Sequence, residues 1–141
     1  MDEISNLSLF RLFHQCSHRM RNAEKYRGQG RLLILLLERG RLTQRELAQI
    51  TGRRSATLSE QLENMEKAGY VTREKNDEDR RNVDVALTPL GTETACDARA
   101  ARAELADKLF ASLTEEDKRR LSAVLGRLAG EWEALSLEKE E

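Results

Sequence analysis

Two groups of residues in this sequence could do chemistry, and the first is the cluster of His14, Cys16 and His18. The two histidines stand four positions apart, so they share one face of a helix and could bind a metal ion there. Cys16 points roughly the other way, and the chain contains no third histidine. A metal site would therefore need carboxylates or a second copy of the chain, and we expect no bound metal and no other cofactor.

Cys16 also lies at helical spacing on an apolar stripe with Leu9, Phe13 and Met20. This position favours a buried structural cysteine. The alternative is a redox-sensing thiol. Such a role requires a lowered thiol pKa, to which a neighbouring protonated histidine could contribute. A disulfide with Cys96 of a second copy would require the two thiols to meet, which the sequence does not show.

The second group is polar and lies in the middle third of the chain. Arginine can read guanine, serine and threonine hydroxyls can bond several base edges, and a methyl group can contact thymine. The candidates for contacts with base edges are Arg54, Ser55, Ala56, Thr57, Ser59 and Glu60. Glu60 could accept from a cytosine amino group or could orient Arg54. The candidates for phosphate contacts, which add affinity without reading sequence, are Gln44, Arg45, Arg53 and Arg73.

Two short helices must position these residues. Thr43 and Glu46 form a capping box, which predicts a helix that begins after Thr43 and ends at Gly52. A second helix is predicted over residues 55–68, and Gly69 ends it. Its buried side is marked by Leu58, Leu62 and Met65.

The hydrophobic period then changes from helical to alternating. Val83, Val85 and Leu87 alternate with less apolar residues, which predicts a strand, and residues 70–73 are its expected partner. The polar segment between them would form the charged tip of a hairpin. Helix, glycine turn, helix and hairpin, in this order, are typical of a winged helix-turn-helix domain. The second helix of such a domain fits the major groove of DNA, and the hairpin tip can reach the minor groove.

Further helices flank this domain on both sides, so the predicted fold class is mainly α with a small β-hairpin wing. Residues 1–40 hold a first helix and a short buried helix over residues 32–37, and residues 41–88 hold the winged helix-turn-helix. Residues 89–141 hold an alanine-rich helix that starts at Thr88-Pro89 and reaches about residue 110, and a last helix capped by Thr114. The apolar stripes of the flanking helices exceed what one winged helix can cover. We therefore expect one structural domain that forms a homodimer through its terminal helices.

Composition narrows the class of protein. The chain has 141 residues, of which 35% are charged, and a formal net charge of −1. The sequence has no apolar run long enough to span a membrane and no signal-peptide pattern, so we expect a soluble cytoplasmic protein. The sequence also lacks the Ser/His/Asp pattern of a catalytic triad, a metal-binding motif and a glycine-rich phosphate-binding loop. These absences argue against an enzyme.

Three stretches give the sequence a family resemblance: TQRELAQITG, SATLSEQLENMEKAGYVTR and DEDRRNVDVALTPLG. They resemble the winged helix of the multiple antibiotic resistance regulator (MarR) family, and the resemblance extends over nearly the whole chain. The third stretch is the most specific, because it pairs an acidic–x–Arg wing tip with a following Leu-Thr-x-x-Gly. The resemblance implies a homodimeric transcription factor, usually a repressor, that binds a pseudo-palindromic duplex. It also implies that a small-molecule effector binds between the dimer helices and the winged helix.

The resemblance assigns roles at the wing tip, residues 77–82. By the family's acidic–x–Arg spacing, Asp79 would orient Arg81, which would enter the minor groove, and Arg80 lies beside it. Glu60 departs from the family, because many relatives place a basic residue there. Some relatives sense peroxides through a cysteine on the first helix, although the residues around Cys16 do not reproduce that motif. Two alternatives stay open: a redox-sensing regulator that acts through Cys16, and a winged-helix binding module without effector control.

Overall fold

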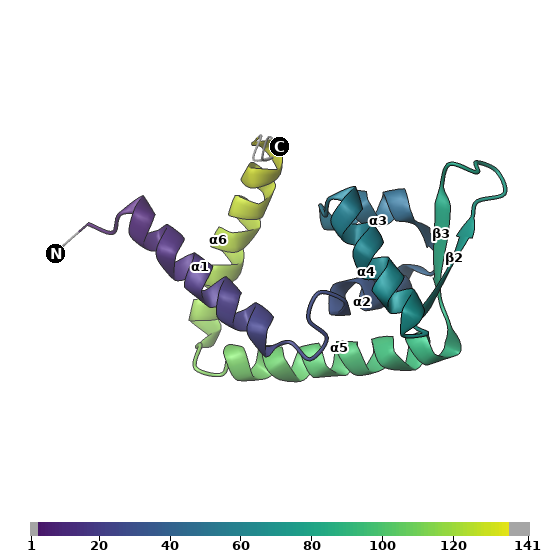
Figure 1. Ribbon diagram of the computed structural model, residues 1–141. Helices are drawn as coiled ribbons and strands as arrows, with labels where there is room; N and C mark the ends of the chain where they lie inside the picture. The colour runs from purple at the N-terminus through teal and green to yellow at the C-terminus, as the bar shows by residue number, and fades with distance from the viewer. Residues whose placement is uncertain (1–2, 136–141) are drawn as a thin grey trace. The chain divides into compact units, whose positions relative to one another are not determined.

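The computed structural model describes residues 3–135 as helices joined to one small sheet (Figure 1). The helices are α1 (Asn6–Ala23), α2 (Gly30–Arg39), α3 (Gln44–Thr51), α4 (Ser55–Lys67), α5 (Pro89–Leu109) and α6 (Glu115–Ala134). The strands are β1 (Leu42–Thr43), β2 (Val71–Lys75) and β3 (Val83–Leu87). The chain forms two compact units that divide between Ala106 and Asp107. The expected fold class, mainly α with a small β wing, is confirmed.

The ends of α3 and α4 follow from local chemistry. The Thr43 hydroxyl accepts a hydrogen bond from the Glu46 N–H at 3.0 Å, and the Glu46 carboxylate accepts one from the Thr43 N–H at 3.3 Å, so the predicted capping box is confirmed. Gly52 ends α3 in the left-handed conformation, with φ of 70°. Only glycine adopts this conformation without strain, which fixes the sharp turn into α4.

The sheet is antiparallel with strand order β1–β3–β2. The predicted hairpin is confirmed, with Val71 opposite Leu87 and Lys75 opposite Val83. The third strand, β1, was not predicted. It is two residues long and pairs Leu42 with Val85, so it is too short to show an alternating pattern.

One apolar core holds the first unit together. It is built from α2, α3, α4, α5 and the sheet, and its fully buried large side chains are Leu32, Leu33, Leu47, Leu58, Leu62, Met65 and Val85. The predictions that residues 32–37 form a short buried helix and that α4 faces the core through three apolar residues are both confirmed. Because α4 is anchored along its inner side, its outer side is presented in a fixed orientation.

The start of α5 is locked to the start of β2. The Thr88 hydroxyl donates to the Gly69 carbonyl at 2.5 Å and accepts from the Gly91 N–H at 2.9 Å. The Thr88 N–H donates to the Tyr70 carbonyl at 3.0 Å. A Cβ at Gly91 would lie 1.8 Å from the Tyr70 carbonyl oxygen, so this position admits no side chain without a backbone shift. These contacts explain Thr88 and Gly91 within the Leu-Thr-Pro-Leu-Gly sequence.

Neither terminal helix is buried within the chain. No residue of α1 is buried, and Phe10 and Leu12 are 69% and 58% exposed. The interpretation of Cys16 as a buried residue is therefore wrong for the single chain, because the apolar stripe of α1 does not pack on the core and Cys16 is exposed. In the second unit, α6 likewise has no buried residue, and Val124 and Trp132 are exposed.

Candidate nucleic-acid interface

The outer side of α4 carries the residues predicted to contact base edges. Ser55, Ala56, Thr57 and Glu60 are exposed, and Ser59 is half-buried. Arg54 precedes the first turn in an extended conformation, with φ of −68° and ψ of 146°. Ala56 and Glu60 therefore lie on the side of α4 opposite its three buried residues, and Thr57 and Ser59 flank that side, as the helical period predicts.

One open groove joins this helix to α3 and to the wing. Its volume is about 630 Å³, and it is lined by Gln44, Arg45, Ala48, Gln49, Ser55, Leu58, Asp79, Arg81, Asn82 and Val83. The structure thus brings together five of the predicted site residues from three separate elements. Gln49 and Asn82 were not predicted as site residues. Gln49 stands four positions after Arg45 on α3, so the shared helix face was the signal that could have found it.

The Asn76 side chain and a short backbone contact shape the wing tip. The Asn76 side-chain oxygen accepts from the backbone N–H groups of Glu78 and Asp79, at 2.8 and 3.0 Å. The amide nitrogen of Asn76 donates to the Asp84 carboxylate at 2.9 Å. The Asn82 N–H donates to the Asp79 carbonyl at 2.9 Å, which closes the turn. The tip therefore has a defined conformation that fixes where Asp79 points.

Asp79 holds Arg81 in place. The carboxylate accepts from the Arg81 backbone N–H and from the guanidinium Nε, each at 3.1 Å, and from Nη2 at 3.4 Å. These bonds from Arg81 hold the pKa of Asp79 below its usual value. The Arg81 side chain is nevertheless 92% exposed. The wing therefore presents an oriented and solvated guanidinium, as the acidic–x–Arg spacing implies, while its insertion into a minor groove stays a prediction.

The predicted phosphate contacts divide into two pairs. Arg45 is exposed and Gln44 half-buried, and both line the groove. Arg53 and Arg73 instead donate hydrogen bonds to other residues of the protein. Arg53 Nη1 donates to the Gly28 carbonyl at 2.7 Å and to Gln61 Oε1 at 2.5 Å.

The side chain of Arg73 is only 22% exposed and pairs with Glu66 through Nη2 at 3.1 Å. Its buried Nε has no hydrogen-bond partner among residues 3–135. The Arg73 guanidinium is thus paired with Glu66 of α4 and largely shielded from solvent. Sequence spacing alone could not show this, because Arg73 lies seven positions from Glu66 on a different element.

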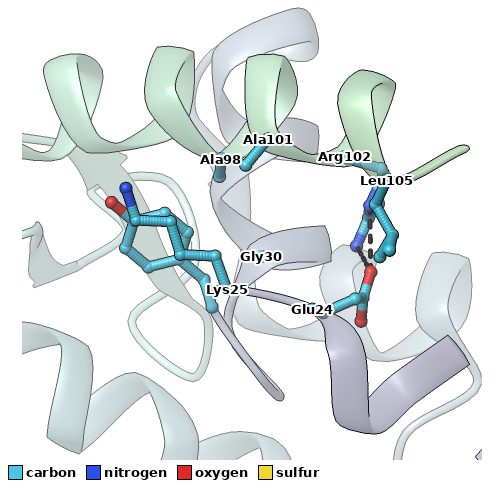
Figure 2. Close-up of a pocket in the computed structure, with 8 residues that line it drawn as sticks. Glu24, Lys25, Gly30, Ala98, Ala101, Arg102 and Leu105 are labelled. Carbon is cyan, nitrogen blue, oxygen red and sulfur yellow. Dashed lines mark hydrogen bonds and ion pairs between the residues drawn. The ribbon is translucent and has the colours of Figure 1, made fainter. Parts of the chain in front are cut away.

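A second polar cluster joins α5 to the segment between α1 and α2, residues 24–29, here called the connection. Glu24 accepts from Arg102 Nη2 at 2.8 Å, while Lys25 and Tyr26 both donate to Asp97, at 2.7 and 2.5 Å. The hydrogen bond to Asp97 raises the pKa of Tyr26. Figure 2 shows the residues that line the cavity beside the Glu24–Arg102 pair. The volume of this cavity is about 20 Å³. That is room for about one water molecule, so a larger ligand would need this region to open.

The histidines and cysteines do not assemble a metal site within the described chain. His14 and His18 line one open hollow of about 550 Å³ with Arg21, Asn22, Arg27 and Gly28. His18 Nε2 lies 3.0 Å from the amide nitrogen of Asn22. Among residues 3–135, no group of three or more His, Cys, Asp or Glu side chains could hold a metal ion. Cys16 and Cys96 are free thiols and both are exposed.

Over the same residues, no helix combines the length and the apolar character that a membrane crossing requires.

The sequence of this chain is similar to those of known transcriptional regulators. The sequence profile of the MarR family matches residues 25–83. The HTH-type transcriptional regulator YwhA of Bacillus subtilis is 31% identical over 102 residues, which cover 72% of this chain and 73% of that protein.

Solved structures agree with the fold. The MepR–DNA complex of S. aureus has a TM-score of 0.78 at 25% identity, and the match covers 92% of this chain and 99% of that one. A mutant MarR from E. coli, solved in complex with operator DNA, has a TM-score of 0.76 at 20% identity, over 85% of this chain and 92% of that one. The match thus extends beyond the winged helix to the flanking helices.

Proposed function

The chain belongs to the MarR family of transcriptional regulators, and we propose that it binds double-stranded DNA as a homodimer and acts as a repressor. The observation that carries the proposal is the groove shared by α3, α4 and the wing, with the exposed Arg81 held at its edge by Asp79. The major groove of DNA admits an α-helix such as α4, and a wing beside that helix can reach the adjacent minor groove. The similar structures of MepR and of a mutant MarR, both solved in complex with DNA, support DNA binding by this fold.

Each part of the interface has a distinct role in this proposal. The outer residues of α4 contact base edges, and they are Arg54, Ser55, Ala56, Thr57, Ser59 and Glu60. Gln44 and Arg45 on α3 contact phosphates and set the register on the duplex. At the wing, Arg81 enters the minor groove, Asp79 orients it, and Arg80 adds positive charge beside it. The acidic Glu60 favours a cytosine partner, because its carboxylate can accept from the cytosine amino group but cannot contact phosphate favourably.

The terminal helices supply the dimer in this proposal. Helix α1 exposes large apolar side chains throughout its length, and α6 exposes Leu121, Val124 and Trp132. Exposed apolar surface of this kind marks an interface with another protein. A two-fold dimer would present two copies of α4 about 34–36 Å apart, which matches one turn of DNA and requires a two-fold symmetric site. Residues 1–40 and 89–141 would thus serve dimerisation, and residues 41–88 would serve DNA binding.

Control by a small molecule or by oxidation is a further part of the proposal. A small effector would change the spacing of the two α4 helices and release the DNA. The exposure of Cys16 supports the redox alternative, because an oxidant can reach this thiol. If oxidation controls the protein, an oxidant will lower the DNA affinity of the wild type but not of Cys16→Ser. Such a regulator acts on chromosomal DNA in the cytoplasm and has no enzymatic step.

A selection on DNA tests the proposal. The purified protein is incubated with fragmented genomic DNA of its source at near-physiological salt, and the bound fragments are sequenced. We expect enrichment of a site with two-fold symmetry. The double variant Arg45→Ala/Arg81→Ala, which changes only exposed side chains, serves as a folded control and should enrich nothing. Equal recovery of all fragments by the wild-type dimer would contradict the proposal.

A further inference from the structure

The Arg53 side chain bridges two segments that are far apart in sequence. Arg53 lies in the turn between α3 and α4, and its Nη1 donates to the Gly28 carbonyl in the connection at 2.7 Å. The second hydrogen of the same nitrogen is donated to Gln61 Oε1 on α4 at 2.5 Å. One guanidinium group therefore ties the recognition helix to the connection.

The surroundings of this bridge are partly shielded from solvent. Burial lowers the pKa of Arg53, and the nearby charge of Arg31 lowers it further, so the guanidinium resides in an environment that opposes its charge. Gly28 has φ of 79°, and a Cβ there would lie 3.4 Å from the amide nitrogen of Gln61. The backbone of the connection thus approaches α4 directly. A partly buried charge with two good acceptors is held more firmly than a solvated side chain would be.

The other end of the connection is held by α5. Arg102 donates two hydrogen bonds to Glu24, at 2.8 and 3.1 Å (Figure 2). Asp97 accepts from Lys25 and Tyr26. Polar contacts therefore join α5 to one end of the connection and, through Arg53, join its other end to α4, with the backbone of residues 24–28 between them. Gln61 directly follows Glu60 and stands one helical turn after Thr57, so holding Gln61 fixes the turns of α4 that face DNA.

We infer that Arg53 is a positioning residue, which sets the orientation of α4 through Gly28 and Gln61 and does not contact phosphate. The inference rests on the proposed DNA-binding function. It assigns to Arg53 a role different from the phosphate contact that its place in the sequence suggests. The same bridge would transmit a displacement of the connection to the recognition helix.

Salt dependence separates the two roles. A side chain that contacts a phosphate releases counterions from the DNA when it binds. Losing one such contact therefore makes the negative slope of log affinity against log salt concentration shallower by about 0.9. Below, a lower slope means a slope of smaller magnitude. A positioning residue changes the affinity for the specific site without changing that slope. The two roles also differ at Gln61, because a phosphate-contacting Arg53 would not need its glutamine partner.

The experiment compares Arg53→Met, Gln61→Met and the double variant on the site obtained by DNA selection, with full titrations at several salt concentrations. We expect each single variant to bind the specific site about tenfold or more weakly, from the loss of a charge-assisted hydrogen bond. The salt slope and the binding of unrelated DNA should stay at the wild-type values. The double variant should bind no more weakly than the worse single variant, because both remove one bridge. Arg45→Met is the matched control, since it removes an exposed arginine that lines the groove and should lower the slope.

Two results would overturn the inference while leaving DNA binding intact. One is a lower slope for Arg53→Met together with unchanged affinity for Gln61→Met, which identifies a phosphate contact. The other is unchanged affinity for both variants. A wild-type protein that binds no specific DNA would overturn the proposed function and the inference together. Thermal unfolding establishes that each variant is folded at the assay temperature. If Arg53→Met is unfolded at that temperature, the two Gln61 variants test the inference instead. We expect Gln61→Met to lose affinity for the specific site and Gln61→Glu, which retains an acceptor for Arg53, to keep it.

Discussion

Replacing Arg81 with alanine should weaken DNA binding without weakening the fold. The side chain is 92% exposed, and its hydrogen bonds are to Asp79, two positions away on the same tip. Its removal therefore leaves the core and the hairpin ladder unchanged. A guanidinium group in a narrow minor groove should contribute about 1–3 kcal/mol, so the affinity should fall about 5- to 150-fold. The salt slope should fall by about 0.9, since one phosphate-neutralising charge is lost.

Fluorescence anisotropy titrations on the selected site, repeated at several salt concentrations, measure both quantities for Arg81→Ala. Thermal unfolding of the same sample measures stability, which should match the wild type. Asp79→Asn is the companion variant, because it keeps the size of the side chain and removes the charge that orients Arg81. It should lose less affinity than Arg81→Ala and keep the salt slope. Unchanged affinity and slope for Arg81→Ala, or a parallel loss of folding stability, would refute the reasoning.

Two further predictions concern the support of the site. Gly91→Ala should destabilise the fold by about 3 kcal/mol or more in chemical denaturation, because the new Cβ would lie 1.8 Å from the Tyr70 carbonyl oxygen. Gly126→Ala, where a Cβ meets nothing within 4 Å, should instead stabilise α6 by up to about 1 kcal/mol, and equal effects at the two sites would contradict this account. Tyr26 should ionise above its ordinary value of 10.0 in an ultraviolet pH titration, because its hydroxyl donates to Asp97. Its contribution to stability is then present below pH 10.0 and is lost as the pH rises through the raised pKa, whereas Asp97→Asn should bring the titration back toward 10.0.

Much of the winged helix could be predicted because its signals are local. The capping box at Thr43 and the left-handed turn at Gly52 depend on residues within one turn of each other. The inner side of α4 follows from the helical period, and the wing follows from alternation in Val83–Leu87. The resemblance to the MarR family, through its acidic–x–Arg spacing, also implied the Asp79–Arg81 contact that the structure shows.

The features that were missed depend on contacts between distant segments. Arg53 and Arg73 look like exposed basic residues beside a recognition helix, yet Arg53 reaches Gly28, which is 25 positions away. Strand β1 exists because Leu42 pairs with Val85. Cys16 was expected in the core because the stripe on α1 is apolar, but that stripe stays exposed in the single chain. An apolar face indicates that something covers a helix and does not indicate whether the same chain does so.

A hydroxyl-radical and methylation footprint of the selected DNA site most directly tests the claim that a homodimer reads DNA through α4 and the wing. The wild type should protect two major-groove segments with centres about 34–36 Å apart, each flanked by a protected minor groove. Arg81→Ala should lose the minor-groove protection and keep the major-groove protection. A single protected segment, or protection that does not change in Arg81→Ala, would contradict the account.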